Sequence, residues 1–269
     1  MNYKCPVCGS ELTEYEKHCK CNNNHSFDKS SSGYVNLLMS NSSSLKRHGD
    51  DKLMVRARRS FLDGGYYSEL REELASAVEN TVSPGCVICD VGCGEGYYTE
   101  KIASCKNTGE IFGIDISKDA LKYAGKRCKS ARFSVSSAFS LPFFNSSIDA
   151  VINVFAPCPY GEFYRVLKDD GFLIKAVPLA EHLWELKQAV YDKPYKNKPE
   201  LTDETLFEKI TQKELKYKID ISSNEQIHNL FTMTPYYYKT SREDFNKLSL
   251  IPRLEVTAHF CIEIYKKRV

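Results

Sequence analysis

Two groups of residues in this 269-residue chain have types and spacing that suit chemistry. The first group begins with a CxxC pair. Twelve residues separate this pair from a further cysteine, and three residues separate that cysteine from a histidine. The preferred members of the group are Cys5, Cys8, Cys21 and His25. Two close pairs of such side chains are typical ligands of a tetrahedral, structural zinc ion. The metal would supply folding energy that so short a segment cannot obtain from a core. Cys19 and His18 remain open as substitute ligands.

The second group is a glycine turn, DVGCGEG, which runs from Asp90 to Gly96. It follows the apolar run 86–91 and precedes a helix-compatible segment, which predicts a strand, a tight turn and a helix start. Glycine lets the backbone approach a ligand closely, and the N–H groups that begin a helix favour a polar or anionic ligand. Dinucleotide sites use GxGxxG, whereas this turn has GxGxG through Gly92, Gly94 and Gly96. The spacing therefore favours S-adenosylmethionine over NAD.

The elements that must position these residues alternate between strand and helix patterns. Strands are expected over 86–91, 110–115, 131–135, 148–154 and 171–177, and helices over 69–80, 117–127, 160–167 and 182–191. This alternation predicts a parallel sheet with helices on both faces. Two further strands are expected over 215–221 and 254–265.

Three polar residues lie at or just beyond the carboxyl ends of these strands. Asp115 ends the second strand, about twenty positions after the glycine turn, where it can accept hydrogen bonds from ribose hydroxyls. Ser137 follows the third strand, and Asn153 lies near the end of the fourth, where such folds place groups that face the acceptor. Together with Asp90 and the three glycines, these residues are the cofactor-binding candidates.

The composition is that of an ordinary globular protein, with 42% hydrophobic and 27% charged residues and a net charge of +2. Such a charge argues neither for nor against a nucleic-acid partner. No apolar window long enough to span a membrane is present, and the N-terminus lacks the core of a signal peptide, so we expect a cytoplasmic protein without a membrane partner. There, the eleven cysteines are better explained as metal ligands, catalytic groups or core residues than as disulfides.

One local segment departs from this neutral balance. The polar run Ser40–Ser44 is typical of a linker, and beyond it six basic residues face only Asp50 and Asp51: Lys46, Arg47, Lys52, Arg56, Arg58 and Arg59. A basic cluster beside a zinc module suits binding of a phosphate backbone. A solvated helix face explains the charges equally well.

The order of motifs along the chain resembles the zinc-containing 23S ribosomal RNA guanine-N1 methyltransferases of the RlmA type. The residues that carry the resemblance are CPVC at 5–8, Cys21 with His25, GYVNLL at 33–38, ARRSFLDGGYY at 57–67, DVGCGEGYYT at 90–99, FAPC at 155–158, HLWELK at 182–187 and MTP at 233–235. They span nearly the whole chain, which makes the match far more specific than any single motif.

The resemblance implies the class I S-adenosylmethionine-dependent methyltransferase fold. This is an α/β architecture with a doubly wound, mostly parallel seven-stranded sheet, here with a small N-terminal zinc-binding domain. We expect a zinc-binding RNA-recognition module over residues 1–38, a linker and basic segment over 39–68, and the methyltransferase domain over 69–269. In that family the cofactor is contacted by residues that match Tyr67, Gly94, Glu95 and His182, and zinc by those that match Cys5, Cys8, Cys21 and His25.

The implied activity is methylation of N1 of a guanine in a hairpin of 23S ribosomal RNA, with S-adenosylmethionine and zinc as cofactors. The motifs do not decide which guanine is modified, and they leave a homodimer open. Since guanine N1 carries a proton that must leave, a base or a hydrogen bond to O6 would help. Asp63 and His182 are the catalytic candidates, and Glu95 is open to this role or to cofactor binding. The alternatives are a small-molecule methyltransferase and a non-catalytic RNA-binding protein on the same fold.

Overall fold

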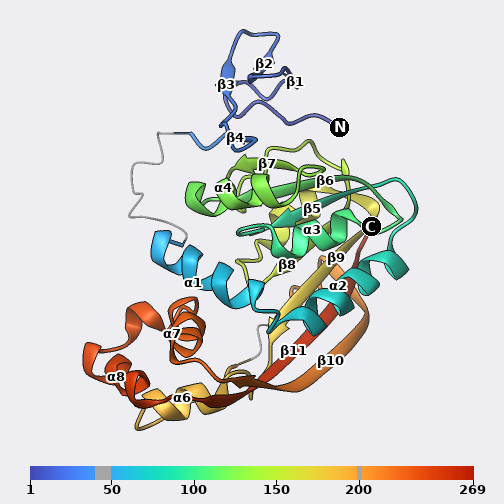
Figure 1. Ribbon diagram of the computed structural model, residues 1–269. Helices are drawn as coiled ribbons and strands as arrows, with labels where there is room; N and C mark the ends of the chain where they lie inside the picture. The colour runs from blue at the N-terminus through green and yellow to red at the C-terminus, as the bar shows by residue number, and fades with distance from the viewer. Residues whose placement is uncertain (40–49, 199–201) are drawn as a thin grey trace.

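The computed structural model describes residues 1–39, 50–198 and 202–269 (Figure 1). The expected linker Ser40–Ser44 lies outside the described residues, as do Lys46 and Arg47 of the basic cluster. None of the helices in the described ranges has the length and apolar character that a membrane crossing requires.

The centre of the molecule is an eight-stranded sheet in the order β10-β11-β9-β8-β5-β6-β7-β4. Its strands are β4 (Tyr34–Asn36), β5 (Cys86–Val91), β6 (Thr108–Asp115), β7 (Arg132–Val135), β8 (Ile148–Val154), β9 (Leu167–Pro178), β10 (Phe207–Ile221) and β11 (Leu254–Lys267). In the sheet, the neighbouring strands β9, β8, β5, β6, β7 and β4 all run parallel to one another. Strand β11 is antiparallel to β9, and β10 is antiparallel to β11. This confirms the expected class I methyltransferase fold, with one strand more than the seven expected.

The additional strand, β4, comes from the N-terminal segment and pairs in parallel with the edge strand β7. Three pairs of residues define its register, from Tyr34 opposite Phe133 to Asn36 opposite Val135. So short a strand carries little periodic signal in the sequence, and its pairing depends on an edge built from residues about one hundred positions away.

The two faces of the sheet are covered differently (Figure 1). One face carries most of the helices and the larger part of the core, and these helices are α1 (Lys52–Asp63), α2 (Ser68–Thr81), α3 (Tyr97–Ala103), α4 (Lys118–Arg127), α6 (Trp184–Val190) and α7 (Asn224–Thr232). The other face carries α5 (Tyr160–Val166) and the N-terminal module. The second face is therefore closed in part by the zinc module, where the sequence pattern predicted only helices.

The N-terminal module is a three-stranded antiparallel sheet formed by β1 (Leu12–Glu14), β2 (His18–Cys21) and β3 (Ser26–Asp28). Tyr3 docks it on the large sheet, because its ring lies 5.2 Å from that of Phe112 and 5.7 Å from that of Phe143, centroid to centroid. An ion pair between Arg132 and Glu14, with 2.6 Å between nitrogen and oxygen, adds a polar contact. The module and the methyltransferase fold thus share one continuous core.

The C-terminal part of the chain closes the region below the sheet in Figure 1 with short helices. These are η1 (Tyr237–Lys239), α8 (Arg242–Asn246) and η2 (Lys247–Leu250), together with α6 and α7. Helix α7 lies against α1, so residues about 170 positions apart meet at one side of the sheet. Helix α1 of this junction and Met233, which follows α7, both line the same cavity.

Candidate functional site

A cavity of about 640 Å³ opens at the carboxyl ends of β5, β6, β8 and β9. The glycine turn and Asp115 form one half of its wall, and the segment from Asn153 to Pro157 forms another part. Helix α1 and the segment Met233–Tyr236 also contribute to the lining. Ligands of open α/β sheets bind at such strand ends, and the volume suits a molecule of cofactor size.

The glycine turn needs glycine for geometric reasons. Gly92, Gly94 and Gly96 have φ values of 79°, 57° and 85°, in the left-handed region that side chains disfavour. A Cβ on Gly92 would come within 2.3 Å of the Cβ of Ala156. Gly92 and Gly94 line the cavity, whereas Gly96 is the N-cap of α3 and packs on Ala124 instead.

Asp115 lines the cavity and holds the glycine turn in place. Its carboxylate accepts hydrogen bonds from the backbone N–H of Gly94, at 2.9 Å, and of Ser117, at 2.7 Å. Burial raises the pKa of Asp115, and these two N–H groups oppose that shift. Ser117 also caps α4, as its position predicts. The carboxylate oxygens keep lone pairs that could accept from a ribose.

Asp90, also predicted to bind the cofactor, lies behind the cavity and not in its wall. The Thr99 hydroxyl donates to it at 2.6 Å, which ties β5 to α3. Burial raises the pKa of Asp90 to about 7. Ser137 likewise does not line the cavity, although its neighbours Ser136 and Ala138 do. Its hydroxyl accepts a hydrogen bond from the backbone N–H of Phe139 at 3.2 Å.

Glu95 lines the cavity with 2% of its surface exposed. Burial raises its pKa to about 6, although the guanidinium of Arg127, 2.8 Å away, acts in the opposite direction. Asp63, a catalytic candidate, is not in the cavity wall. It pairs with Arg127 at 2.5 Å and with Arg59 at 3.4 Å. The structure thus brings Asp63 into an ion-pair cluster with Arg127, which also pairs with Glu95, and not into the cavity wall.

His182, the other catalytic candidate, lines the cavity beside Tyr67. Burial lowers its pKa to about 3, so the ring is neutral near pH 7. Its Nδ1 accepts from the backbone N–H of His259 at 3.4 Å, which leaves the ring proton on Nε2, 3.4 Å from the Tyr67 hydroxyl. In this arrangement His182 is a hydrogen-bond donor and orients Tyr67, instead of taking up a proton at Nε2.

The cavity wall contains an aromatic residue whose exposure the sequence did not reveal. Phe155 has a φ of 54°, an outlier for a bulky side chain, and 44% of its surface is exposed. Its ring lies nearly parallel to that of His182, with 6.3 Å between centroids. The Asn153 amide donates to the Pro157 carbonyl at 3.1 Å and so braces the turn that carries Phe155. Such strain is typical of functional sites.

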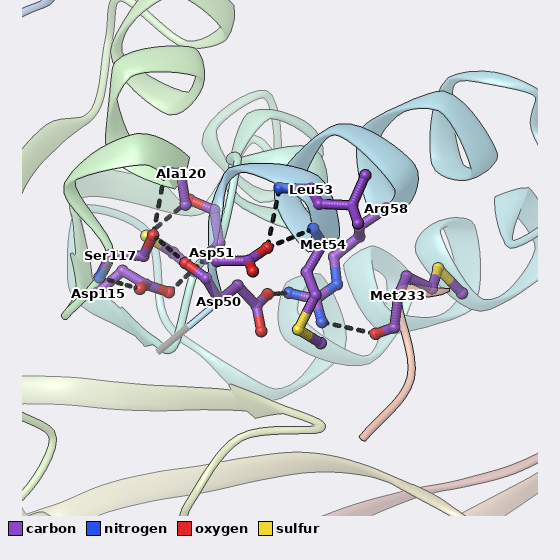
Figure 2. A network of polar contacts seen from close by, with 11 residues as sticks. Asp50, Asp51, Leu53, Met54, Arg58, Asp115, Ser117, Ala120 and Met233 are labelled. Atoms are coloured by element: carbon purple, nitrogen blue, oxygen red, sulfur yellow. Dashed lines mark hydrogen bonds and ion pairs between the residues drawn. The ribbon is translucent and has the colours of Figure 1, made fainter. Parts of the chain in front are cut away.

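Helix α1 reaches the cavity through a polar network that the sequence did not predict (Figure 2). Asp51 caps the helix by accepting from Leu53 and Met54, at 2.8 Å and 2.9 Å. Asp50 forms an ion pair with Arg58, and its carbonyl accepts from the Ser117 hydroxyl at 2.9 Å.

Two arginines of the expected phosphate-binding cluster contact other residues of the protein, Arg58 at the cavity and Arg59 at the exposed surface. Arg58 lines the cavity, and the guanidinium of Arg59 pairs with Asp63 and lies 4.6 Å from the ring centre of Tyr123. The different positions of Arg58 and Arg59 follow from the fold, because a run of charges in a sequence does not show which face of a helix meets a cavity.

The four predicted zinc ligands converge in the N-terminal module. The ligand atoms of Cys5, Cys8, Cys21 and His25 all lie within 4.8 Å of one another. The Sγ atoms of Cys8 and Cys21 are 3.7 Å apart, close to the ~3.8 Å edge of a tetrahedron with Zn–S bonds of about 2.3 Å. Cys19 lies outside this group, fully buried, and His18 stacks on Tyr15. The donor set therefore fits a closed tetrahedral zinc site.

Comparison with known proteins agrees with both parts of the molecule. A family model described as "RlmA, N-terminal" matches residues 3–43, and one described as "Methyltransferase domain" matches residues 82–230. Among solved structures, a Bacillus halodurans methyltransferase-like protein has a TM-score of 0.50 and 16% identity, covering 74% of this chain and 100% of its own. A chain in the Haloferax volcanii complex of the Trm112 methyltransferase activator has a TM-score of 0.51 and 19% identity, covering 82% and 100%. These likenesses show the fold alone.

Sequence relatives narrow the family further. The 23S rRNA (guanine(748)-N(1))-methyltransferase of Streptomyces fradiae is 32% identical, over 70% of this chain and 67% of its own length. A Bacillus subtilis (strain 168) protein, provisionally named as a 23S rRNA (guanine-N(1)-)-methyltransferase, is 29% identical over 98% of this chain and 97% of its own. The cofactors are S-adenosylmethionine and zinc, as expected from the two modules. The chain is an enzyme, and it belongs to the family of the 23S rRNA (guanine-N1)-methyltransferases.

Proposed function

We propose that this enzyme transfers a methyl group to N1 of a guanine in a hairpin loop of 23S ribosomal RNA. The observation that carries the proposal is one cavity with two different halves. The glycine turn, Asp115 and Glu95 form a polar half that suits the cofactor, and the exposed ring of Phe155 lies in the other half. An exposed aromatic ring offers a stacking surface to an unpaired base.

The cofactor fits the polar half through several residues of this chain. We assign its binding to Tyr67, Gly92, Gly94, Glu95, Asp115 and His182, all of which line the cavity. When bound, S-adenosylmethionine supplies a methyl group on an activated sulfonium. The enzyme then has chiefly to position the donor and the base, because the displacement is in line.

The acceptor base needs a partner for the proton on N1 and for the charge that develops on O6. Backbone carbonyls of the turn from Asn153 to Pro157 are available to orient the base, and the Phe155 ring stacks against the plane of the base. His182 contributes as a neutral donor through Tyr67. A guanine in a duplex has N1 engaged in pairing, which supports a target in a loop or a flipped base.

The zinc ribbon supports RNA over a small molecule as the substrate. We assign zinc binding to Cys5, Cys8, Cys21 and His25, which would fix the module as a rigid body on the sheet. A small-molecule methyltransferase has no use for such a module. A ribosomal substrate also fits the expected cytoplasmic location.

Reverse transcription of 23S ribosomal RNA from cells with and without this protein tests the proposal. Methylation of N1 blocks Watson–Crick pairing, so a stop at one loop guanine should be present only when the protein is present. The same stop should return with the wild-type gene but not with a Glu95→Gln, His182→Gln double variant. Identical stop patterns in both strains would overturn the proposal.

A further inference from the structure

Arg58 is a cation placed inside the cavity by α1. It lies four residues before Leu62, so both residues face the same side of the helix, and both line the cavity. The side chain of Arg58 is 31% exposed, and that of its ion-pair partner Asp50 is 21% exposed. Both residues line the cavity, so this ion pair belongs to the wall of the space where a ligand would bind.

The guanidinium is held in a fixed orientation (Figure 2). One terminal nitrogen pairs with the Asp50 carboxylate, and the other donates to the Met233 carbonyl at 3.0 Å. A guanidinium has five N–H donors. These contacts within the described residues use two of them, so the side chain is preorganised and still has donors for a planar anion.

The other cations in the cavity wall are placed differently. Among the described residues these are Lys175 and Lys198. The Lys175 ammonium is turned toward Tyr160 and Thr202, at 2.9 Å and 3.0 Å, on the face of the sheet that carries α5. Lys198 is exposed and ends a described range. Arg58 is the cation that a ligand in the cofactor half would meet.

Charge effects agree with this position. Burial raises the pKa of Asp115 and of Glu95, both of which line the polar half, and the positive charge of Arg58 is one of the smaller effects that oppose this rise. S-adenosylmethionine has a single anionic group, its α-carboxylate. An anion in this half needs a cation, because Asp50, Asp115 and Glu95 would otherwise repel it.

We propose that Arg58 is a cofactor-binding residue that holds the α-carboxylate of the methionine moiety, with Asp50 and Met233 fixing the guanidinium for this contact. The inference concerns the cofactor alone and does not depend on which base accepts the methyl group. An RNA phosphate is the other anion that could reach this arginine, and binding measurements with a cofactor analogue that lacks the carboxylate separate the two.

Calorimetric titration with S-adenosylhomocysteine, and with its analogue that lacks the carboxylate, tests the proposal. Arg58→Gln should weaken the binding of S-adenosylhomocysteine roughly 10- to 100-fold, the usual effect of losing charge-assisted hydrogen bonds. The same variant should change the affinity for the decarboxylated analogue less than about twofold, because the lost contact is absent there. Arg58→Lys keeps the positive charge but loses the planar set of guanidinium N–H donors. Its affinity for S-adenosylhomocysteine should therefore lie between those of wild type and Arg58→Gln.

Two matched variants control for the ion pair and for charge. Asp50→Asn removes the same ion pair from the opposite side but leaves the guanidinium and its contact with the Met233 carbonyl, so it should weaken the binding of S-adenosylhomocysteine less than Arg58→Gln does. Arg59→Gln removes a neighbouring arginine that does not line the cavity and should leave both affinities unchanged. Thermal unfolding of each variant checks that the fold is retained.

Three outcomes would overturn the proposal. Equal losses for both compounds in Arg58→Gln would make the arginine a structural support. A loss in Asp50→Asn as large as that in Arg58→Gln would assign the effect to the ion pair. Unchanged affinity for S-adenosylhomocysteine combined with weaker RNA binding would assign Arg58 to a phosphate. If Arg58→Gln does not fold, Arg58→Lys must show the carboxylate-specific loss for the proposal to stand.

Discussion

At the residue scale, burial shifts neighbouring cavity groups in opposite directions for one physical reason. Water stabilises the charged form of each group, so its exclusion raises the pKa of Glu95 to about 6 and lowers that of His182 to about 3. The sequence placed both residues near the cofactor through their motifs. It could not reveal their protonation, because burial is a property of the folded molecule.

His182 should make stability depend on pH. Its pKa is depressed in the folded state, so the folded protein binds fewer protons than the unfolded chain between pH 6.5 and about 3. Its contribution is therefore present above pH 6.5 and lost as the pH falls, by up to about 1.4 kcal/mol per pH unit. Denaturant unfolding at pH 7 and pH 5 should show a smaller loss in His182→Gln than in wild type. Equal losses would mean that His182 is not buried in the neutral form.

Glu95 should make cofactor affinity depend on pH. If the ionised carboxylate binds the cofactor, affinity for S-adenosylhomocysteine falls below pH 6, by up to about tenfold per pH unit, as Glu95 takes up a proton. Glu95→Gln should bind S-adenosylhomocysteine roughly tenfold more weakly than wild type at pH 7.5, and its affinity should no longer fall below pH 6. Glu100→Gln, at a 40% exposed carboxylate outside the cavity wall, is the control. Parallel pH profiles for wild type and Glu95→Gln would contradict this role.

At the element scale, the strands and helices with strong periodicity were predictable. The expected strands 86–91 and 148–154 are β5 and β8, and Ser117 caps α4 as expected. The first half of β10 was missed because its side chains from Glu208 to Glu214 are exposed and lack apolar alternation. That half is held by pairing with β11 and by contacts such as the Lys209–Glu263 ion pair, at 2.9 Å.

The turn between β5 and α3 should tolerate no side chain at its first glycine. In Gly92→Ala the new Cβ meets Ala156 at 2.3 Å, and φ is 79°. We expect a loss of about 1–3 kcal/mol in unfolding free energy and a large loss of cofactor affinity. Gly161→Ala, where a Cβ meets nothing within 4 Å, is the matched control. Denaturant unfolding that leaves both variants at wild-type stability would contradict the close approach seen at Gly92.

At the scale of the whole molecule, the zinc module and the methyltransferase fold are one packed unit. Tyr3 of the module and Phe112 of the sheet belong to the same apolar core. The spacing of the cysteines predicted the ligand group, since close pairs bring their own ligands together. Nothing local in the sequence predicted the docking, the added strand β4 or the approach of Arg58 to the cavity, because each depends on contacts across long stretches of chain.

Removal of zinc should therefore destabilise the whole chain. A strong chelator should lower the main unfolding temperature by roughly 5–10 °C, because the docked module contributes to the shared core. Cys21→Ser should show the lower temperature without chelator and respond little to it, whereas Cys105→Ser, outside the module, should respond like wild type. A separate early transition with an unchanged main transition would show instead that the module unfolds independently.

Nucleoside analysis after methyl transfer by the purified enzyme tests most directly whether guanine N1 of 23S ribosomal RNA accepts the methyl group. Unmodified 23S ribosomal RNA is incubated with the protein and S-adenosylmethionine carrying a labelled methyl group, then digested and separated by liquid chromatography with mass detection. We expect label in 1-methylguanosine alone, at about one methyl group per RNA molecule, and none with Gly92→Ala. Label in another nucleoside, or no label in RNA from a folded, zinc-loaded enzyme, would contradict this expectation.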